Sequence, residues 1–72
     1  MAKPRFRIFQ DRAGQYRWSL ISGNNEIVAV SEGYKYHSGA ENSVNLIQFL
    51  APIAEIRDEV KLAAILRSLR RK

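Results

Sequence analysis

Two segments near the beginning of the chain alternate side chains of different character, which is the pattern of β-strands. They are "RFRIFQ" at residues 5–10 and "QYRWSLIS" at residues 15–22. Successive side chains of a strand point to opposite faces, so Tyr16, Trp18 and Leu20 share one face of the second strand. A face this apolar must be buried, and the alternation therefore predicts a sheet with another apolar element packed against it.

Short connections join these strands to each other and to a third strand. Residues 11–14, "DRAG", form a predicted turn in which Gly14 takes a positive φ. Residues 23–25, "GNN", form a predicted hairpin loop, because glycine and asparagine tolerate left-handed backbone. The third strand is the apolar segment "EIVAVS" at 26–31. Such short connections predict an antiparallel meander.

A helix is predicted after the third strand. Ser38 stands three residues before Glu41, which is the spacing of a capping box at a helix N-terminus. Pro52 disfavours helical geometry in the residue before it, so the helix should end near Leu50 or Ala51. Apolar residues at helical spacing provide the stripe that packs on the sheet. They are Ala40, Val44, Ile47 and Leu50, with Leu46 and Phe49 widening the stripe.

The C-terminal part of the chain ends in a second predicted helix. Residues 52–58 fit either a short extended edge or the first turns of a helix, and both interpretations stay open. From Glu59 the pattern is helical, with Asp58 as the predicted N-cap. Apolar residues spread over more than half of the circumference, which is more than one sheet face can cover, so we expect this helix to join two copies of the chain. These residues are Val60, Leu62, Ala63, Ile65, Leu66 and Leu69.

The size of the chain supports the same expectation. Its 72 residues include no cysteine, so neither a disulfide nor a thiolate metal site can reinforce the core. A chain this short buries only about 60–65% of the surface that it exposes when unfolded. We predict one α+β domain over 1–72, with a β-β-β-α unit at about 5–51 and a mostly helical segment at 52–72, assembled as a homodimer.

Charge and hydropathy limit the classes of partner. No apolar run approaches the roughly 20 residues of a membrane span, and the basic N-terminal segment is not followed by the apolar stretch of a signal peptide. We therefore expect a cytoplasmic protein without a membrane partner. The net charge of +5 suits either solubility and helix-dipole stabilisation or contact with nucleic-acid phosphates. The candidate nucleic-acid contacts are Arg5, Arg7, Arg17, Arg67, Arg70 and Arg71.

The sheet face opposite Trp18 carries arginines mixed with apolar side chains. A three-stranded sheet backed by a helix can lie in the major groove of DNA, with arginines meeting phosphates or guanine edges. The same face, with Phe9 and Ile21 exposed, also suits contact with a second copy, which is the interpretation that we favour. The candidate dimer contacts are Phe9, Ile21, Leu62, Ile65 and Leu69.

No constellation of residues predicts catalysis or metal binding. His37 directly precedes the predicted helix cap and is expected to be an exposed loop residue. Glu32 has two interpretations: an acid paired with the phenol of Tyr34, or, as we favour, a solvated residue or cross-strand partner for an arginine such as Arg17. The sequence has no glycine-rich phosphate loop and no metal-ligand spacing. We expect no enzymatic activity and no cofactor.

The order of these motifs resembles the YegP-like family, small bacterial and archaeal proteins of unknown function. The resemblance covers roughly residues 6–58, and residues from 59 onward have no counterpart in it. Two positions depart from the family pattern, because Asn25 and Ser43 stand where the family often has glycine. The matching residues are Gly14, Tyr16, Arg17, Trp18 and Leu20 in the second strand, Asn24, Glu26 and Ile27 at the hairpin, and Ser31, Glu32, Gly33, Tyr34, Glu41, Asn42 and Val44 at the junction and helix.

The resemblance implies a β-β-β-α unit that occurs as a tandem pair in one chain or as single units that pair as homodimers. It implies no established activity, no cofactor and no catalytic residues. The combined prediction is a non-enzymatic homodimeric interaction module of unknown process. The alternative is a nucleic-acid-binding module that uses the basic sheet face and the basic C-terminal tail.

Overall fold

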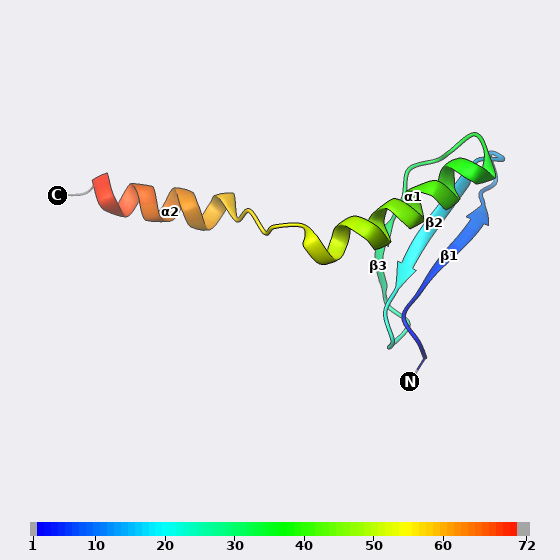
Figure 1. The fold of residues 1–72 in the computed structure, drawn as a ribbon, viewed down its shortest axis with the longest axis horizontal. Helices are drawn as coiled ribbons and strands as arrows, with labels where there is room; N and C mark the ends of the chain where they lie inside the picture. Colours follow the sequence, from blue (N-terminus) through cyan, green and yellow to red (C-terminus); the bar gives the residue numbers. More distant parts are fainter. Residues whose placement is uncertain (1, 71–72) are drawn as a thin grey trace.

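The structure is a computed structural model that describes residues 2–70. It has a three-stranded antiparallel sheet and two α-helices, which confirms the predicted α+β class (Figure 1). The first α-helix is followed by one 3₁₀ turn, η1. The elements are β1 Arg5–Gln10, β2 Tyr16–Ile21, β3 Ile27–Val30, α1 His37–Leu50, η1 Ala51–Ile53 and α2 Glu59–Arg70.

The three strands form the predicted meander in the order β1-β2-β3. Ile8 lies opposite Trp18 across β1 and β2, and Leu20 lies opposite Ala29 across β2 and β3. A register shift between Leu20 and Ile21 inserts an irregularity into the second pairing. The central strand β2 is thus flanked on both sides, while β1 and β3 are the two edges of the sheet.

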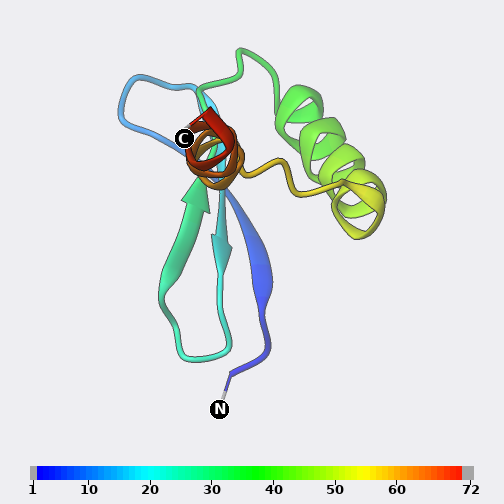
Figure 2. The same ribbon diagram turned by 90° about the vertical axis from the view of Figure 1, so that its left-hand side faces the viewer.

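Helix α1 covers one face of the sheet, and Figure 2 shows it running along one side of the strands. The indole of Trp18 is 7% exposed beneath the helix, and Ala40 is completely buried at 0%. Val44 is buried one helical turn further along. The ring of Phe6 meets the indole edge-on, with the two centroids 5.5 Å apart. Trp18 of the predicted inward face is therefore part of the core, while Tyr16 and Leu20 of the same face are half-buried.

The turns between strands also follow the sequence. Gly14 has a φ of 85°, the positive value predicted for the first turn. Asn25, in the predicted hairpin loop, has a φ of 65°. Asparagine accepts this left-handed conformation better than most other residues, so the second hairpin keeps its geometry without glycine.

The predicted capping box at the start of α1 is wrong. The N-cap is Tyr36, and within the described chain no side-chain hydrogen bond caps the helix. The backbone carbonyl of Tyr36 instead accepts a hydrogen bond from the N–H of Gly39 at 3.0 Å. Because the helix begins at His37, Ser38 and Glu41 both lie inside its first turns rather than around its end. The predicted end of the helix near Leu50 is confirmed.

The C-terminal segment leaves the sheet and α1. After η1, residues 54–58 form no regular element, so this stretch is neither a strand nor an early part of α2. Asp58 caps α2 as predicted, since its Oδ1 accepts a hydrogen bond from the N–H of Lys61 at 2.8 Å. Within residues 2–70, α2 packs against no other element and extends the molecule to 57 Å in its longest dimension (Figure 1).

Candidate interaction surfaces

The junction between β3 and α1 is held by side-chain hydrogen bonds. The Oγ of Ser31 accepts a hydrogen bond from the backbone N–H of Trp18 at 2.9 Å and donates one to the carbonyl of Glu32 at 2.8 Å. Further along, the backbones of Tyr16 and Tyr34 exchange two hydrogen bonds of 2.7 Å. The Ser31 hydroxyl thus links β2 to the chain between the end of β3 and the Tyr16–Tyr34 bridge.

A second serine hydroxyl connects the sheet, the junction and α1. The indole N–H of Trp18 donates to the Oγ of Ser43 at 3.0 Å. The phenol of Tyr34 donates to the same oxygen at 3.0 Å. Glu32 is exposed and forms no acid–phenol pair with Tyr34 among the described residues. In the sequence, Ser43 stands out only as a departure from glycine, because its hydrogen-bond partners come from elements distant in sequence.

The junction leaves little space at its two glycines. A Cβ atom at Gly33 would lie 2.8 Å from the Cδ of Gln15, and a Cβ at Gly39 would lie 3.2 Å from the Tyr34 ring. His37 is exposed, as predicted, but it is the first residue of α1 rather than a loop residue. Across residues 2–70, no group of three or more histidine, aspartate or glutamate side chains is placed to hold a metal ion.

Glu32 is exposed to solvent, one part of the favoured interpretation, but its pairing with Arg17 is wrong. The Nε–H of Arg17 donates to the Oδ2 of Asp11 at 2.7 Å, and its terminal N–H donates to the carbonyl of Ser31 at 3.1 Å. Glu32 lies in the connection that follows β3, whereas Asp11 directly follows β1 at the hairpin end beside Arg17. The second oxygen of Asp11 accepts hydrogen bonds from the N–H groups of Ala13 and Gln15, both at 2.9 Å.

These donors lower the pKa of Asp11 from its ordinary value, with the Arg17 hydrogen bond as the largest cause and the Gln15 N–H next. A carboxyl whose pKa is lowered by folding stabilises the fold fully above its unfolded pKa. That stabilisation disappears as the pH falls through the lower folded value.

We therefore expect Asp11→Asn, which keeps the Oδ1 acceptor, to be less stable than the natural chain at neutral pH. The difference should shrink toward zero as the pH falls through the acidic range. Urea unfolding midpoints across a pH series would measure it. A difference that stays constant at every pH would show that Asp11 acts only through the turn.

The sheet face opposite α1 is only partly open. The guanidinium of Arg7 lies over the ring of Phe9, 4.6 Å from its centroid. Arg5 donates to the side-chain oxygen of Asn25 at 3.2 Å. Ile21 was expected to be exposed, and this is wrong, because it is 9% exposed between Arg5 and Ile27 on the neighbouring strands.

Exposed apolar side chains concentrate elsewhere, on the outside of α1, on β3 and on α2. The prediction that Leu46 and Phe49 widen the buried stripe of α1 is wrong, because Leu46 is 56% exposed and Phe49 is 71% exposed. They lie on the side of the helix that faces away from the sheet. The other residues with at least 44% exposure are Ile27, Val28, Val30, Tyr36, Leu50, Ile53, Ile56, Val60, Leu62, Ile65, Leu66 and Leu69.

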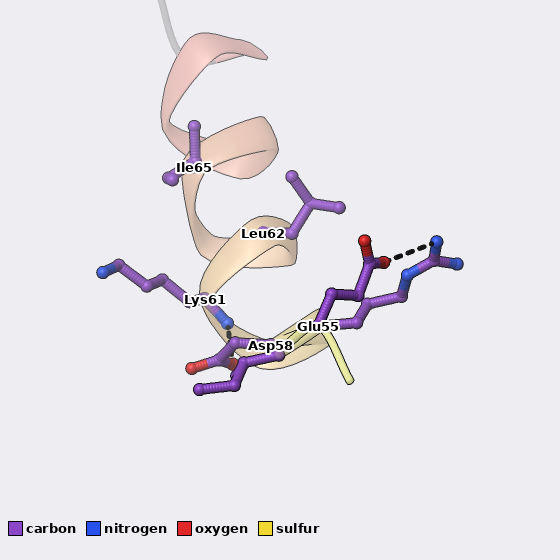
Figure 3. A pocket seen from close by; sticks show the side chains of 7 residues that line it. Glu55, Asp58, Lys61, Leu62 and Ile65 are labelled. Carbon is purple, nitrogen blue, oxygen red and sulfur yellow. Dashed lines mark hydrogen bonds and ion pairs between the residues drawn. The ribbon is translucent and has the colours of Figure 1, made fainter. Parts of the chain in front are cut away.

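The surface of α2 combines these apolar residues with charges at its two ends. Figure 3 shows a hollow beside the start of α2, where Leu62 and Ile65 project from the helix near Asp58 and Glu55. Glu55 also pairs with Arg57 at 3.2 Å. Arg67 and Arg70 occupy the last turn, and Arg71 lies outside the described residues. No helix within residues 2–70 has the length and apolarity needed to cross a lipid bilayer.

Comparison with known proteins places the body of this fold in a family. The chain matches the "Domain of unknown function (DUF1508)" over residues 11–58. An NMR solution structure of a protein from Haloferax volcanii has 34% sequence identity and a TM-score of 0.70. The match covers 81% of this chain and 98% of that chain. The family match ends at residue 58, one residue before α2 begins.

Relatives in bacteria and archaea carry the name UPF0339. A protein of Neisseria meningitidis serogroup B is 32% identical over 53 residues, covering 74% of this chain and 95% of the relative. A protein of Methanosarcina acetivorans is 36% identical over 52 residues, covering 72% and 90%. A protein of Stutzerimonas stutzeri is 40% identical over 47 residues, 65% of this chain but 42% of the relative. The chain therefore belongs to the DUF1508, or UPF0339, family of unknown function, which is the YegP-like family that its motifs resemble.

Proposed function

We propose that the protein is a non-enzymatic interaction module that assembles as a homodimer through α2. The observation that carries this proposal is the exposure of α2. Its large apolar residues Val60, Leu62, Ile65, Leu66 and Leu69 are all at least 50% exposed, and the helix packs against none of the other described elements.

A helix of this kind is only marginally stable when it packs against nothing. α2 has 12 residues, and isolated helices shorter than about 12–15 residues are marginal in water. Helices in proteins gain most of their stability from packing an apolar face against something. Contiguous apolar surface of this kind marks an interaction site on soluble proteins. A second copy of the chain is always available to cover it.

Chain lengths in the family agree with a two-unit assembly. In the Stutzerimonas stutzeri relative, the matched segment is 42% of the chain, which leaves room for a second unit of similar size. A short chain with one unit reaches the same number of units by pairing with a second copy. The family match stops before α2, so this helix supplies a contact of its own rather than part of the family fold.

The other uses of the surface have less support. Arg17 is already bound to Asp11 and to the carbonyl of Ser31, and Arg7 is stacked on Phe9. These contacts draw the guanidinium groups toward the protein rather than toward a phosphate backbone. An enzyme is less favoured still, because the polar groups of Ser31, Ser43 and Tyr34 are used by structural hydrogen bonds.

The proposal predicts that the chain loses its assembly when it ends at Asp58. Static light scattering over a concentration series from micromolar upward should give twice the 8.3 kDa chain mass for the full chain. The shortened chain should stay near the mass of one copy. Its fold should persist, because the family match ends at residue 58 and α2 packs against none of the other described elements. Trp18 fluorescence reports whether the fold is kept.

Two results would contradict the proposal. A full chain that stays at 8.3 kDa throughout the series would remove the homodimer. A shortened chain that still doubles its mass would move the contact to the sheet or to the outer side of α1.

A further inference from the structure

We infer that α2 pairs with α2 of a second copy in an antiparallel orientation, with Glu59 of each helix against Arg70 of the other. This inference rests on the proposed homodimer and specifies its contact. The evidence is the spacing of the apolar residues of α2, the distribution of its charges and the position of Glu59 and Arg70 around the helix.

The apolar residues of α2 form a stripe suited to helix pairing. Leu62, Ile65, Leu66 and Leu69 follow the spacing i, i+3, i+4, i+7. At about 100° per residue they fall within roughly a 100° arc on one side of the helix. All four are at least 50% exposed in the single chain. We call these four residues the α2 stripe, and two such stripes can interdigitate along a short helix pair.

The charges of α2 are divided between its ends. Asp58 and Glu59 lie at the N-terminal end, and Arg67 and Arg70 lie in the last turn. Lys61 is the one basic residue of the first turn of α2, and it projects on the opposite flank of the stripe. Two helices in parallel orientation would bring both arginine-rich ends together and align their dipoles unfavourably. Antiparallel helices bring each acidic end to a basic end.

The positions around the helix favour the antiparallel arrangement further. Glu59 and Arg70 are separated by only about 20° around the helix axis, and both lie roughly 70–90° from the centre of the α2 stripe on the same flank. A two-fold axis that relates antiparallel helices places equivalent flanks side by side. Each Glu59 therefore meets Arg70 of the second copy, and the dimer contains this ion pair twice.

Disulfide trapping tests the orientation directly, since the natural chain has no cysteine. We expect Glu59→Cys mixed with Arg70→Cys to form a mixed disulfide dimer under mild oxidation, with one natural ion pair still in place. Each variant alone should give little disulfide-linked dimer. Ala64→Cys is the matched control, because residue 64 lies about 150° from the stripe and should not cross-link.

Charge exchange gives a second readout that needs no disulfide. Glu59→Arg should raise the dimer dissociation constant by about 2- to 10-fold, because two ion pairs are lost and like charges meet. Adding Arg70→Glu to the same chain should restore most of the affinity, since the pairs form again with reversed signs. Light scattering or sedimentation measures both variants, and their circular dichroism checks the fold.

The outcomes separate this inference from the proposed function. Disulfide-linked dimers of Glu59→Cys alone or of Arg70→Cys alone, without a disulfide between the two different variants, would overturn the antiparallel pairing. They would leave the homodimer intact. A double exchange that fails to restore affinity would also overturn it. A full chain that never dimerises, with α2 folded onto its own sheet or α1, would overturn both proposals.

Discussion

Replacing Trp18 with alanine is expected to lower the free energy of unfolding at 25 °C by about 3–5 kcal/mol. The indole is 7% exposed, packs edge-on against Phe6 and lies beneath α1 near the fully buried Ala40. Removing a buried aromatic side chain of this size costs about 3–5 kcal/mol. A domain of this length has a free energy of unfolding of only about 4–11 kcal/mol. The loss therefore takes between about a quarter and all of the stability.

Urea unfolding followed by circular dichroism measures this effect, because the variant lacks the only tryptophan. Trp18→Phe is the matched control. It keeps most of the apolar contact but loses the N–H that donates to Ser43, so we expect a smaller cost of about 1–2 kcal/mol. If Trp18→Ala stays within about 1 kcal/mol of the natural chain, the core lies elsewhere than on this face of β2.

The position of Trp18 is predictable from sequence because strand alternation has only two phases. Once Tyr16 and Leu20 share a face with Trp18, the helix stripe that includes Ala40 and Val44 has one apolar surface to cover. The structure confirms that choice, since Trp18, Ala40 and Val44 are buried together. Local pattern and global packing agree here, and that agreement makes the prediction reliable.

The arginine contacts are harder to predict because they depend on register. The sequence indicates Asp11 only as a turn residue and favours Glu32 as a partner of Arg17. The observed register places Phe9 opposite Arg17, and Asp11 follows two residues later beside the same position. A diagonal pair of this kind becomes visible once the hairpin is aligned, so this signal was available and was missed.

The covering of α2 could not be predicted from the chain alone. The periodicity gives a helix from Glu59 and Asp58 as its cap, and both are confirmed. The same periodicity shows more apolar surface than the sheet can cover, but it does not identify what covers it. The relative orientation of two α2 helices can be inferred only when the charges at both ends of the helix are considered together.

The start of α1 shows why short motifs mislead. The Ser38–Glu41 spacing matches a capping box. The backbone before Ser38, however, is already held by the bridge between Tyr16 and Tyr34. Tertiary pairing therefore decides where the chain turns, and the helix begins before the motif. The hydroxyl that matters at this junction belongs to Ser31 instead.

Ser31→Ala is accordingly expected to lower the free energy of unfolding by about 1–3 kcal/mol. Ser31 is 9% exposed, and its Oγ is the acceptor for the backbone N–H of Trp18. Alanine leaves that buried donor without a partner and also removes the bond to the carbonyl of Glu32. An unsatisfied buried N–H costs its full desolvation, which is why one oxygen atom has an effect of this size.

The matched control is Ser38→Ala, a change of the same atoms in the exposed first turn of α1. A functional capping box would make this change cost about 1 kcal/mol. Because no side-chain cap is formed among the described residues, we expect a change within about 0.5 kcal/mol. Urea unfolding followed by Trp18 fluorescence measures both variants. If both variants lose the same free energy of unfolding, or if Ser38→Ala loses more, Ser38 caps α1 after all. Ser31 then has no special role at the junction.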